Sequence, residues 1–213
     1  MKDKITIGIL GLQGDIEENM IAAKDALEHM KVRGSIKAVR YSEEFEKVDG
    51  LILPGGESTV MSNLIAIQGG ALQTIKRRIS NGMPAMGTCA GMIMLSKRAY
   101  DRVVGETKQQ LMHILDIVVE RNAFGRQNDS FEADLEIPIL GRGTFRGIFI
   151  RSPIVREIGT GVDQIAKFEN NVVAVKQKNI IGTAFHPELA GDDRLHRQFI
   201  KMVIEFKRKG SQQ

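Results

Sequence analysis

The chain contains one cysteine, and its surroundings are typical of a catalytic nucleophile. Residues 87–91 read Gly-Thr-Cys-Ala-Gly and stand between a short strand pattern at 84–86 and an apolar, helix-compatible stretch at 92–95. Two glycines allow the sharp strand-to-helix turn that lifts the central side chain out of a sheet. The N–H groups at the start of the helix favour a thiolate and can hold an oxyanion. Cys89 is therefore a candidate nucleophile, and a buried cysteine in a glycine-rich turn is the alternative.

A histidine and a glutamate near the C-terminus could activate such a thiol. A predicted strand at 180–185 leads into His186, Pro187 and Glu188. Residues two apart on an extended segment point the same way, so Glu188 can accept the Nδ1 proton of His186 and leave Nε2 facing the thiol. Cys89, His186 and Glu188 are thus predicted to form a triad. The alternative is a strand-end histidine satisfied by its surroundings beside a surface glutamate.

A glycine pair marks a third candidate loop. Residues 54–59 read Pro-Gly-Gly-Glu-Ser-Thr, follow a buried strand pattern at 50–53 and open a helix. Consecutive glycines let backbone N–H groups approach a ligand oxygen closely, with Ser58 or Thr59 expected to cap the helix. A plain tight turn is the alternative. Glycines 8, 11 and 14 have the spacing GxxGxxG, which does not match a dinucleotide-binding fingerprint.

The elements around these loops alternate between strand and helix in the first half of the chain. Apolar strands joined by short connections indicate a parallel sheet buried on both faces. Asp15 and Glu18 are expected to form a helix N-cap pair. The predicted strands lie at 5–12, 36–41, 50–53 and 84–86, with an amphipathic helix after residue 15 and helical segments within 58–81.

The second half is predicted to contain successive strands. They lie at 114–120, 131–137, 145–150, 172–177 and 180–185, followed by a helix from residue 193 and a frayed tail at 207–213. The expected fold is α/β with three layers: a mostly parallel central sheet flanked by helices, with additional mixed or antiparallel strands. No linker divides the chain, so residues 1–213 are expected to form one domain.

Composition excludes several classes of protein. The 213 residues are 42% hydrophobic and 26% charged, and the net charge of +4 is spread along the chain, so nucleic acid is not the expected partner. Apolar runs are far shorter than the ~20 residues that cross a bilayer, and no secretory segment starts the chain, which predicts a soluble cytoplasmic protein without membrane partners. No metal-ligand spacing is present, and the remaining histidines are expected to pack or face solvent: His29, His113 and His196.

In combination, these blocks resemble the class I (triad) glutamine amidotransferases, and specifically the PdxT/SNO family of glutaminase subunits of pyridoxal 5'-phosphate synthase. The resemblance covers nearly the whole chain and is strongest in the Gly-Leu-Gln-Gly-Asp block at 11–15 and in the blocks at 54–59 and 118–127. Two segments depart from the family's usual length, 28–44 and 98–113. The matching blocks are 8–14, 51–59, 87–91, 118–127, 129–134, 149–151 and 185–188.

The resemblance implies a flavodoxin-like fold and a reaction. Cys89 would attack the side-chain amide of L-glutamine, with His186 as base and then acid and Glu188 orienting it. The backbone amides of Gly56 and Ala90 would form the oxyanion hole. The other implied site residues are Gly56, Glu57, Ser58, Arg121, Ile150 and Arg151, which would bind glutamine, and Gln13, an interface residue that helps to set the oxyanion hole.

The resemblance also implies a partner. Ammonia would pass to a (β/α)8-barrel subunit that makes pyridoxal 5'-phosphate, which is then a product and not a bound cofactor; no cofactor is expected. Alternatives are an amidotransferase subunit for another ammonia acceptor, a non-catalytic scaffold subunit and, less well matched, a cysteine stress protein whose elbow lacks the downstream His-Pro-Glu.

Overall fold

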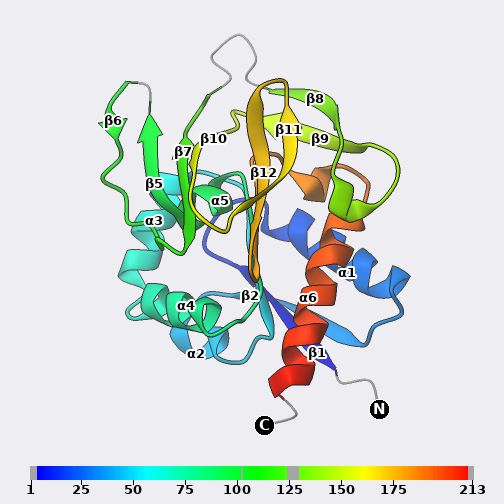
Figure 1. The fold of residues 1–213 in the computed structure, drawn as a ribbon. Coiled ribbons are helices and arrows are strands. Elements are labelled where there is room, and N and C mark those ends of the chain that lie inside the picture. The colour runs from blue at the N-terminus through cyan, green and yellow to red at the C-terminus, as the bar shows by residue number, and fades with distance from the viewer. Residues whose placement is uncertain (1–3, 102, 124–129, 211–213) are drawn as a thin grey trace.

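The computed structural model describes residues 4–101, 103–123 and 130–210 (Figure 1). Its strands are β1 (Ile5–Leu10), β2 (Gly34–Val39), β3 (Gly50–Leu53), β4 (Ala85–Thr88), β5 (Ser96–Asp101), β6 (Gly105–Glu106), β7 (Leu115–Glu120), β8 (Ser130–Leu135), β9 (Phe145–Ile150), β10 (Ile154–Ile158), β11 (Asp163–Phe168), β12 (Asn171–Gln177) and β13 (Ile180–Thr183). Its helices are α1 (Ile16–His29), α2 (Ser42–Phe45), α3 (Ser58–Ile67), α4 (Ala71–Ser80), α5 (Ala90–Leu95) and α6 (Arg194–Gly210), with short 3₁₀ turns η2 (Pro138–Leu140) and η3 (Pro187–Leu189).

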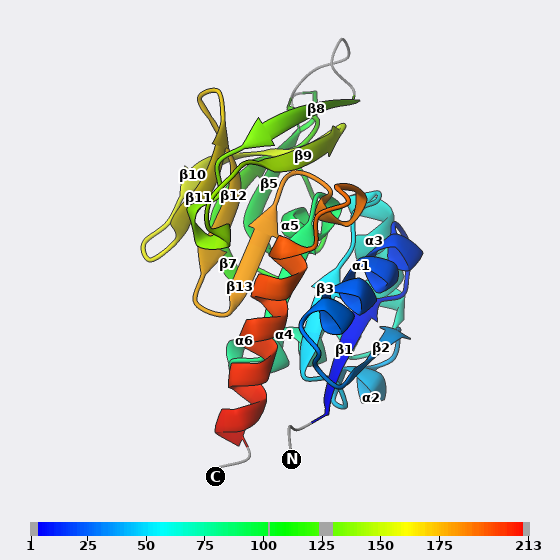
Figure 2. The same ribbon diagram turned by 90° about the vertical axis from the view of Figure 1, so that its right-hand side faces the viewer.

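The first half of the chain builds a parallel sheet. Strands β2, β1, β3, β4 and β13 lie in that order, and each pairs in parallel with its neighbour. Every residue of β3, β4 and β13 is buried, because helices cover both faces of the sheet. Helices α1 and α6 pack together on one face, and α3, α4 and α5 lie on the other (Figures 1 and 2). The predicted three-layer α/β fold is therefore confirmed.

The second half extends this sheet with mostly antiparallel strands. Beyond β13 the order continues through β12, β10, β7, β5 and β6, and β11 pairs with β12 from off that path. Strands β8 and β9 form a separate antiparallel ribbon. Aromatic rings join the ribbon to the main sheet. Phe131 and Phe149 stack on each other within the ribbon with ring centroids 4.6 Å apart, and both lie near Phe168 of β11. The ribbon lies close to the ends of the parallel strands (Figure 2).

Several predicted boundaries were wrong. Strands β5, β6, β10 and β11 were not predicted, and β13 ends at Thr183 rather than at residue 185. The tail expected to fray from residue 207 continues α6 to Gly210. Lys207 stabilises this last turn because its Nζ lies 2.8 Å from Asp49 Oδ1, while Asp49 Oδ2 accepts a hydrogen bond from Thr6 N. None of the helices in the described ranges combines the length and the apolar sequence of a membrane span.

Candidate active site

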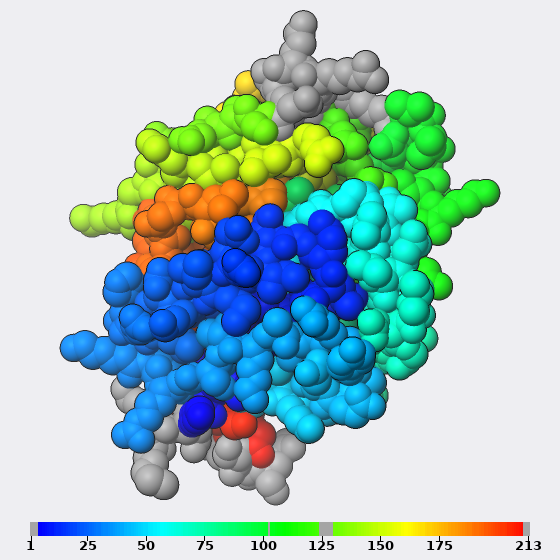
Figure 3. Space-filling view, turned by 180° about the vertical axis from the view of Figure 1, so that it is seen from behind, coloured from blue at the N-terminus to red at the C-terminus, as the bar shows by residue number. Residues whose placement is uncertain are grey.

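A pocket of about 270 Å³ lies where the loops after β1, β3, β4 and β13 meet. Carboxyl ends of parallel strands are where ligands bind in open α/β sheets. The pocket is lined by every predicted site residue except Ala90 and Glu188, and also by Asp15, Ile93 and Asn122. On the face shown in Figure 3, the N-terminal segment (blue), the region around α3 (cyan) and the segment after β13 (orange) meet side by side.

Cys89 occupies a strained turn between β4 and α5. Its backbone has φ 47° and ψ −104°, a conformation that costs a non-glycine residue about 1–3 kcal/mol. The flanking glycines are required sterically: a Cβ at Gly87 would lie 2.6 Å from the Gly91 carbonyl carbon, and one at Gly91 would lie 2.0 Å from Leu53 O. Cys89 N donates to Thr183 O at 2.8 Å, which ties the turn to β13. The turn thus has the geometry expected of a nucleophile elbow.

Ala90, the residue after the nucleophile, opens α5. It is buried and lies in the first turn, where helix geometry leaves backbone N–H groups without partners inside the helix. This is the position that the predicted oxyanion hole requires.

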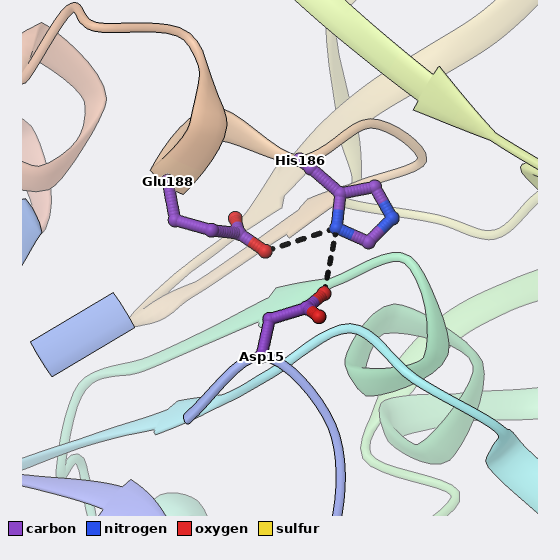
Figure 4. Close-up of side chains that lie close together, drawn as sticks. All are labelled: Asp15, His186 and Glu188. Atoms are coloured by element: carbon purple, nitrogen blue, oxygen red, sulfur yellow. Dashed lines mark hydrogen bonds and ion pairs between the residues drawn. The ribbon is translucent and has the colours of Figure 1, made fainter. Parts of the chain in front are cut away.

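His186 is buried beside Cys89 and has two carboxylate partners. The residue is 4% exposed, and its Nδ1 lies 3.0 Å from Glu188 Oε1 and 3.0 Å from Asp15 Oδ2 (Figure 4). The Glu188 side chain is fully buried, and that of Asp15 is 34% exposed. Burial of the ring lowers its pKa, but hydrogen bonds with Asp15, Cys89 and Glu188 outweigh this and raise the pKa of His186 to about 12. The three partners therefore favour an imidazolium.

The backbone around His186 fixes the direction of the ring. His186 N donates to Ile148 O at 2.8 Å, and His186 is the N-cap of the 3₁₀ turn that carries Glu188. With carboxylates at Nδ1, Nε2 is the nitrogen left to meet the thiol. The structure thus brings Cys89, His186 and Glu188 together, with Glu188 on a 3₁₀ turn rather than on an extended strand.

The loop after β1 packs directly on the glycine pair after β3. Gln13 Oε1 accepts a hydrogen bond from Glu57 N at 2.9 Å. A Cβ at Gly14, which has φ 103°, would lie 1.8 Å from Gly55 O, and one at Gly56, which has φ 146°, would lie 2.6 Å from Gln13 Oε1. Gln13 therefore holds the peptide that follows Gly56, the residue predicted to contribute to the oxyanion hole.

The start of α3 is capped differently from the prediction. Glu57 is the N-cap, and its carboxylate accepts hydrogen bonds from Thr59 N and Val60 N at 3.0 and 2.7 Å. The expected caps, Ser58 and Thr59, lie inside the helix because the chain leaves its extended conformation one residue earlier. Burial raises the pKa of Glu57, but these backbone hydrogen bonds outweigh it, so the pKa lies below its ordinary value. The Glu57 side chain is therefore a carboxylate anion that backbone hydrogen bonds hold in place at the pocket.

Arg121 lines the same pocket and is held by a hydrogen-bond network. Its Nη2 lies 3.0 Å from Glu57 Oε1, and its Nη1 donates to Thr59 Oγ1 at 3.0 Å and to Gln109 Oε1 at 3.2 Å. Gln109 Oε1 also accepts from Ser58 Oγ at 3.3 Å. The pocket therefore presents a paired cation and anion, which is complementary to the carboxylate and ammonium groups of an amino acid.

The remaining predicted binding residues close the pocket from β9. Ile150 ends this strand and is 36% exposed, and Arg151 follows it with φ 44°. Ile150 N is held by Ser152 Oγ at 3.1 Å. The 118–127 and 129–134 blocks are described only in part, since residues 124–129 lie outside the described ranges.

Asp15, His186 and Glu188 also form the group most suited to a metal ion among the described residues. One donor atom from each lies within 4.8 Å of the others. A divalent cation there would have to displace the proton that Nδ1 shares with both carboxylates, because a metal-bound imidazole nitrogen carries no proton. The raised pKa of His186 opposes that loss. The arrangement suits an imidazolium better than a metal site.

Two residues near the reacting groups were missed by the sequence analysis. Asp15 was expected to cap α1, but it makes no side-chain capping hydrogen bond and points to His186 instead. Gln109 lies in the 98–113 segment of unusual length and joins the Arg121 network. Asp15 belongs to the selective block at 11–15, which was a signal, whereas nothing in the pattern singled out Gln109.

Comparison with known proteins connects this geometry to a family. Residues 9–205 match the model of the SNO glutamine amidotransferase family. The pyridoxal 5'-phosphate synthase subunit PdxT of Pyrococcus furiosus is 45% identical over 94% of this chain and all of that protein. PdxT of Nitrosopumilus maritimus is 42% identical, over 94% of this chain and 98% of the relative. These matches confirm the resemblance stated from the motifs.

Solved structures agree. A crystal structure of a glutamine amidotransferase superposes with a TM-score of 0.79 at 39% identity, covering 92% of this chain and 98% of that one. A glutamine amidotransferase from Thermotoga maritima, at 12% identity and a TM-score of 0.58 over 99% of this chain and 86% of that one, shares the fold. This chain is a member of the SNO glutamine amidotransferase family.

Proposed function

We propose that this enzyme is the glutaminase subunit of a pyridoxal 5'-phosphate synthase, hydrolysing L-glutamine to L-glutamate and delivering the ammonia to a synthase subunit. The observation that carries the proposal is the buried His186 ring, which hydrogen-bonds with Cys89, Asp15 and Glu188 at a pocket that Cys89, Asp15 and His186 line together. The names of the relatives support the product of the complex. We place this activity in a single domain of residues 1–213 in the cytoplasm.

The geometry accounts for the first half of the reaction. The Cys89 thiolate attacks the carboxamide carbon of glutamine, and the resulting oxyanion is held by the backbone N–H groups of Gly56 and Ala90. The His186 imidazolium then gives its Nε2 proton to the amide nitrogen, and the C–N bond breaks to release ammonia. A γ-glutamyl thioester remains on Cys89. Preorganised donors of this kind contribute about 3–4 kcal/mol each in comparable sites.

The second half regenerates the thiolate. Neutral His186 takes a proton from water as the water oxygen attacks the thioester carbonyl, and the C–S bond then breaks to give glutamate. Glu188 is a hydrogen-bond acceptor beside Nδ1 and stabilises each imidazolium. One glutamine and one water become one glutamate and one ammonia, so no cofactor or metal ion is required.

The charged groups around Arg121 bind the α-groups of glutamine. Arg121 offers a guanidinium to the substrate α-carboxylate, and Glu57 offers a carboxylate to the α-ammonium, so the ion pair between them opens when substrate enters. Ser58, Ile150 and Arg151 complete the lining around the substrate. The side-chain amide is thereby directed toward Cys89.

The ammonia acceptor is a separate part of the proposal. Free ammonia is mostly protonated at neutral pH and is then not a nucleophile, so direct transfer to a docked synthase is required. We propose that the partner is a (β/α)8-barrel subunit, with pyridoxal 5'-phosphate as the product of the complex.

The test combines the purified full chain with glutamine labelled with ¹⁵N in the side-chain amide and with the synthase subunit. Wild-type protein should release glutamate and place ¹⁵N in pyridoxal 5'-phosphate, and a diazoketone analogue of glutamine should label Cys89, the sole cysteine. Cys89→Ala should abolish both reactions. Full turnover by Cys89→Ala would overturn the nucleophile assignment, and glutamate release without ¹⁵N in pyridoxal 5'-phosphate would overturn the assigned acceptor.

A further inference from the structure

One ring nitrogen of His186 faces two carboxylates. Asp15 Oδ2 and Glu188 Oε1 each lie 3.0 Å from Nδ1, and they arrive from opposite ends of the chain (Figure 4). Nδ1 carries a single proton, so only one acceptor can receive it in a linear hydrogen bond at a time. A triad needs one carboxylate at this nitrogen, and the second requires its own explanation.

The Asp15 side chain contacts His186 instead of capping α1, the role expected of an aspartate at the start of a helix. It is the N-cap of α1 with φ −77° and ψ 59°, yet its side chain makes no capping hydrogen bond. A helix that lacks a side-chain cap is less stable than one that has it. The backbone carbonyl of Asp15 instead accepts hydrogen bonds from the side chain and the backbone N–H of Asn19, at 2.8 and 3.2 Å. The first turn of α1 is thus fixed through the main chain, and the carboxylate is left to meet His186.

The neighbouring loop leaves the Asp15 carboxylate little freedom. Asp15 N donates to Gly55 O at 3.2 Å. A Cβ on Gly55 would lie 2.3 Å from His186 Cε1 and 2.7 Å from Asp15 Oδ2, so the bare glycine backbone packs against both groups. Gln13, two residues earlier, holds Glu57 N. One short loop therefore contacts both the imidazole and the peptide after Gly56.

We propose that Asp15 is a positioning residue of the glutaminase, sharing the Nδ1 proton of His186 with Glu188 so that Nε2 stays directed at Cys89. This inference rests on the proposed function. The loop at 13–15 then sets the direction of the base and the shape of the oxyanion loop together. Any movement of this loop changes both at once.

The contact also has an electrostatic effect. Among the described residues, the titratable groups against the ring are Asp15 from the loop after β1, Cys89 from the elbow and Glu188 from η3. Each stabilises the imidazolium and raises the pKa of His186, against the lowering effect of burial. Removing the charge of Asp15 must therefore lower the pKa of His186, and the imidazolium is lost at a lower pH.

Asp15→Asn tests this, because it keeps the size of the side chain and removes the charge. Glu18→Gln is the matched control, since it removes the same charge from the exposed first turn of α1. In the full chain, ring ¹⁵N NMR should show His186 of Asp15→Asn losing its proton about one pH unit lower, whereas Glu18→Gln follows wild type. In the complex with the synthase subunit, kcat should fall about tenfold, with its alkaline limb shifted to lower pH and the KM for glutamine unchanged.

A second variant separates positioning from folding. Asp15→Ser retains a residue type that caps helices well but cannot place an anion on the ring, so it should reproduce the Asp15→Asn profile with a thermal midpoint at least equal to it. A His186 titration and a kcat profile that superimpose on wild type in both variants would overturn the proposal. The ring titration requires no turnover, so it distinguishes failure of this inference from failure of the proposed function, which Cys89→Ala tests.

Discussion

Two histidines of this protein are buried to nearly the same extent but have opposite surroundings. His186 lies at the pocket with three polar partners. His196, on α6, is fully buried, and neither of its ring nitrogens has a hydrogen-bond partner in the described structure. Burial lowers the pKa of His196 to about 4, only weakly opposed by Asp193, whereas the partners of His186 reverse the effect of burial. Partners, and not burial, decide whether a ring here is charged.

The two rings therefore make the free energy of unfolding depend on pH in opposite directions: His186 reduces it at high pH, and His196 reduces it at low pH. The pKa of His186 is raised in the folded state, so its stabilising contribution is complete below the ordinary value of 6.5 and disappears as pH rises through the folded pKa. His196 remains neutral in the folded state while the unfolded chain takes up a proton below about 6.5, so stability falls as pH drops from there to about 4.

The largest expected effect comes from removing a partner of the charged ring. Glu188→Gln leaves a hydrogen-bond acceptor of similar shape but removes the buried anion, so the imidazolium is destabilised when it forms. We expect kcat for glutamine hydrolysis to fall about 10²–10⁴-fold, the usual contribution of general acid–base catalysis. His196→Leu is the matched control and should leave kcat unchanged. A loss below tenfold in Glu188→Gln would mean that Asp15 alone can hold the ring.

A smaller effect is expected from removing the ring without partners. His196→Leu should abolish acid sensitivity worth about 1–3 kcal/mol of unfolding free energy between pH 7 and pH 4.5, because no group at position 196 then takes up a proton on unfolding. Urea titrations at the two pH values give the difference. His113→Gln, at an exposed histidine, should retain the wild-type acid sensitivity. Equal acid sensitivity in His196→Leu and wild type would show that other groups cause it.

The smallest effect tests whether the partners of Arg121 act on binding rather than on chemistry. Gln109→Ala removes one neutral acceptor from Arg121, worth about 0.5–1.5 kcal/mol. We expect the KM for glutamine to rise about 2–10-fold with kcat unchanged. Steady-state kinetics in the presence of the synthase subunit separates the two constants, and a change confined to kcat would contradict this division of the pocket.

The sequence predicted the parts of the site that depend on residues close together in the chain, and missed a contact between residues far apart in it. Cys89 and the pair His186 and Glu188 were predicted because each motif is local: a turn between glycines and a histidine two residues from a glutamate. Asp15 was assigned a local role, since an acidic residue before a helix resembles a cap. Its actual partner lies near the other end of the chain, and no local pattern encodes that contact.

The same distinction applies to the fold. Strands β1 and β3 were predicted because both are almost entirely buried and their sequences are apolar apart from Thr6. Strand β5 follows α5 without an intervening turn and carries Lys97, Arg98 and Asp101, so its sequence shows no strand pattern. Strand β10 contains Arg156 and Glu157 and was missed for the same reason. Half-exposed strands gain their stability from partners across the sheet, which composition alone does not reveal.

The position of β13 has a consequence for synthesis of the enzyme. This strand lies between β4 and β12, next to the strand that leads into Cys89, although it is the last strand of the chain. A ribosome-bound chain in which Cys89 has emerged already has β3 beside β4, but it lacks β13 on the other side of β4, and it lacks His186 and Glu188 until residues beyond 188 have emerged. Nascent chains therefore cannot hydrolyse glutamine, and the site is complete only after β13 has inserted between β4 and β12.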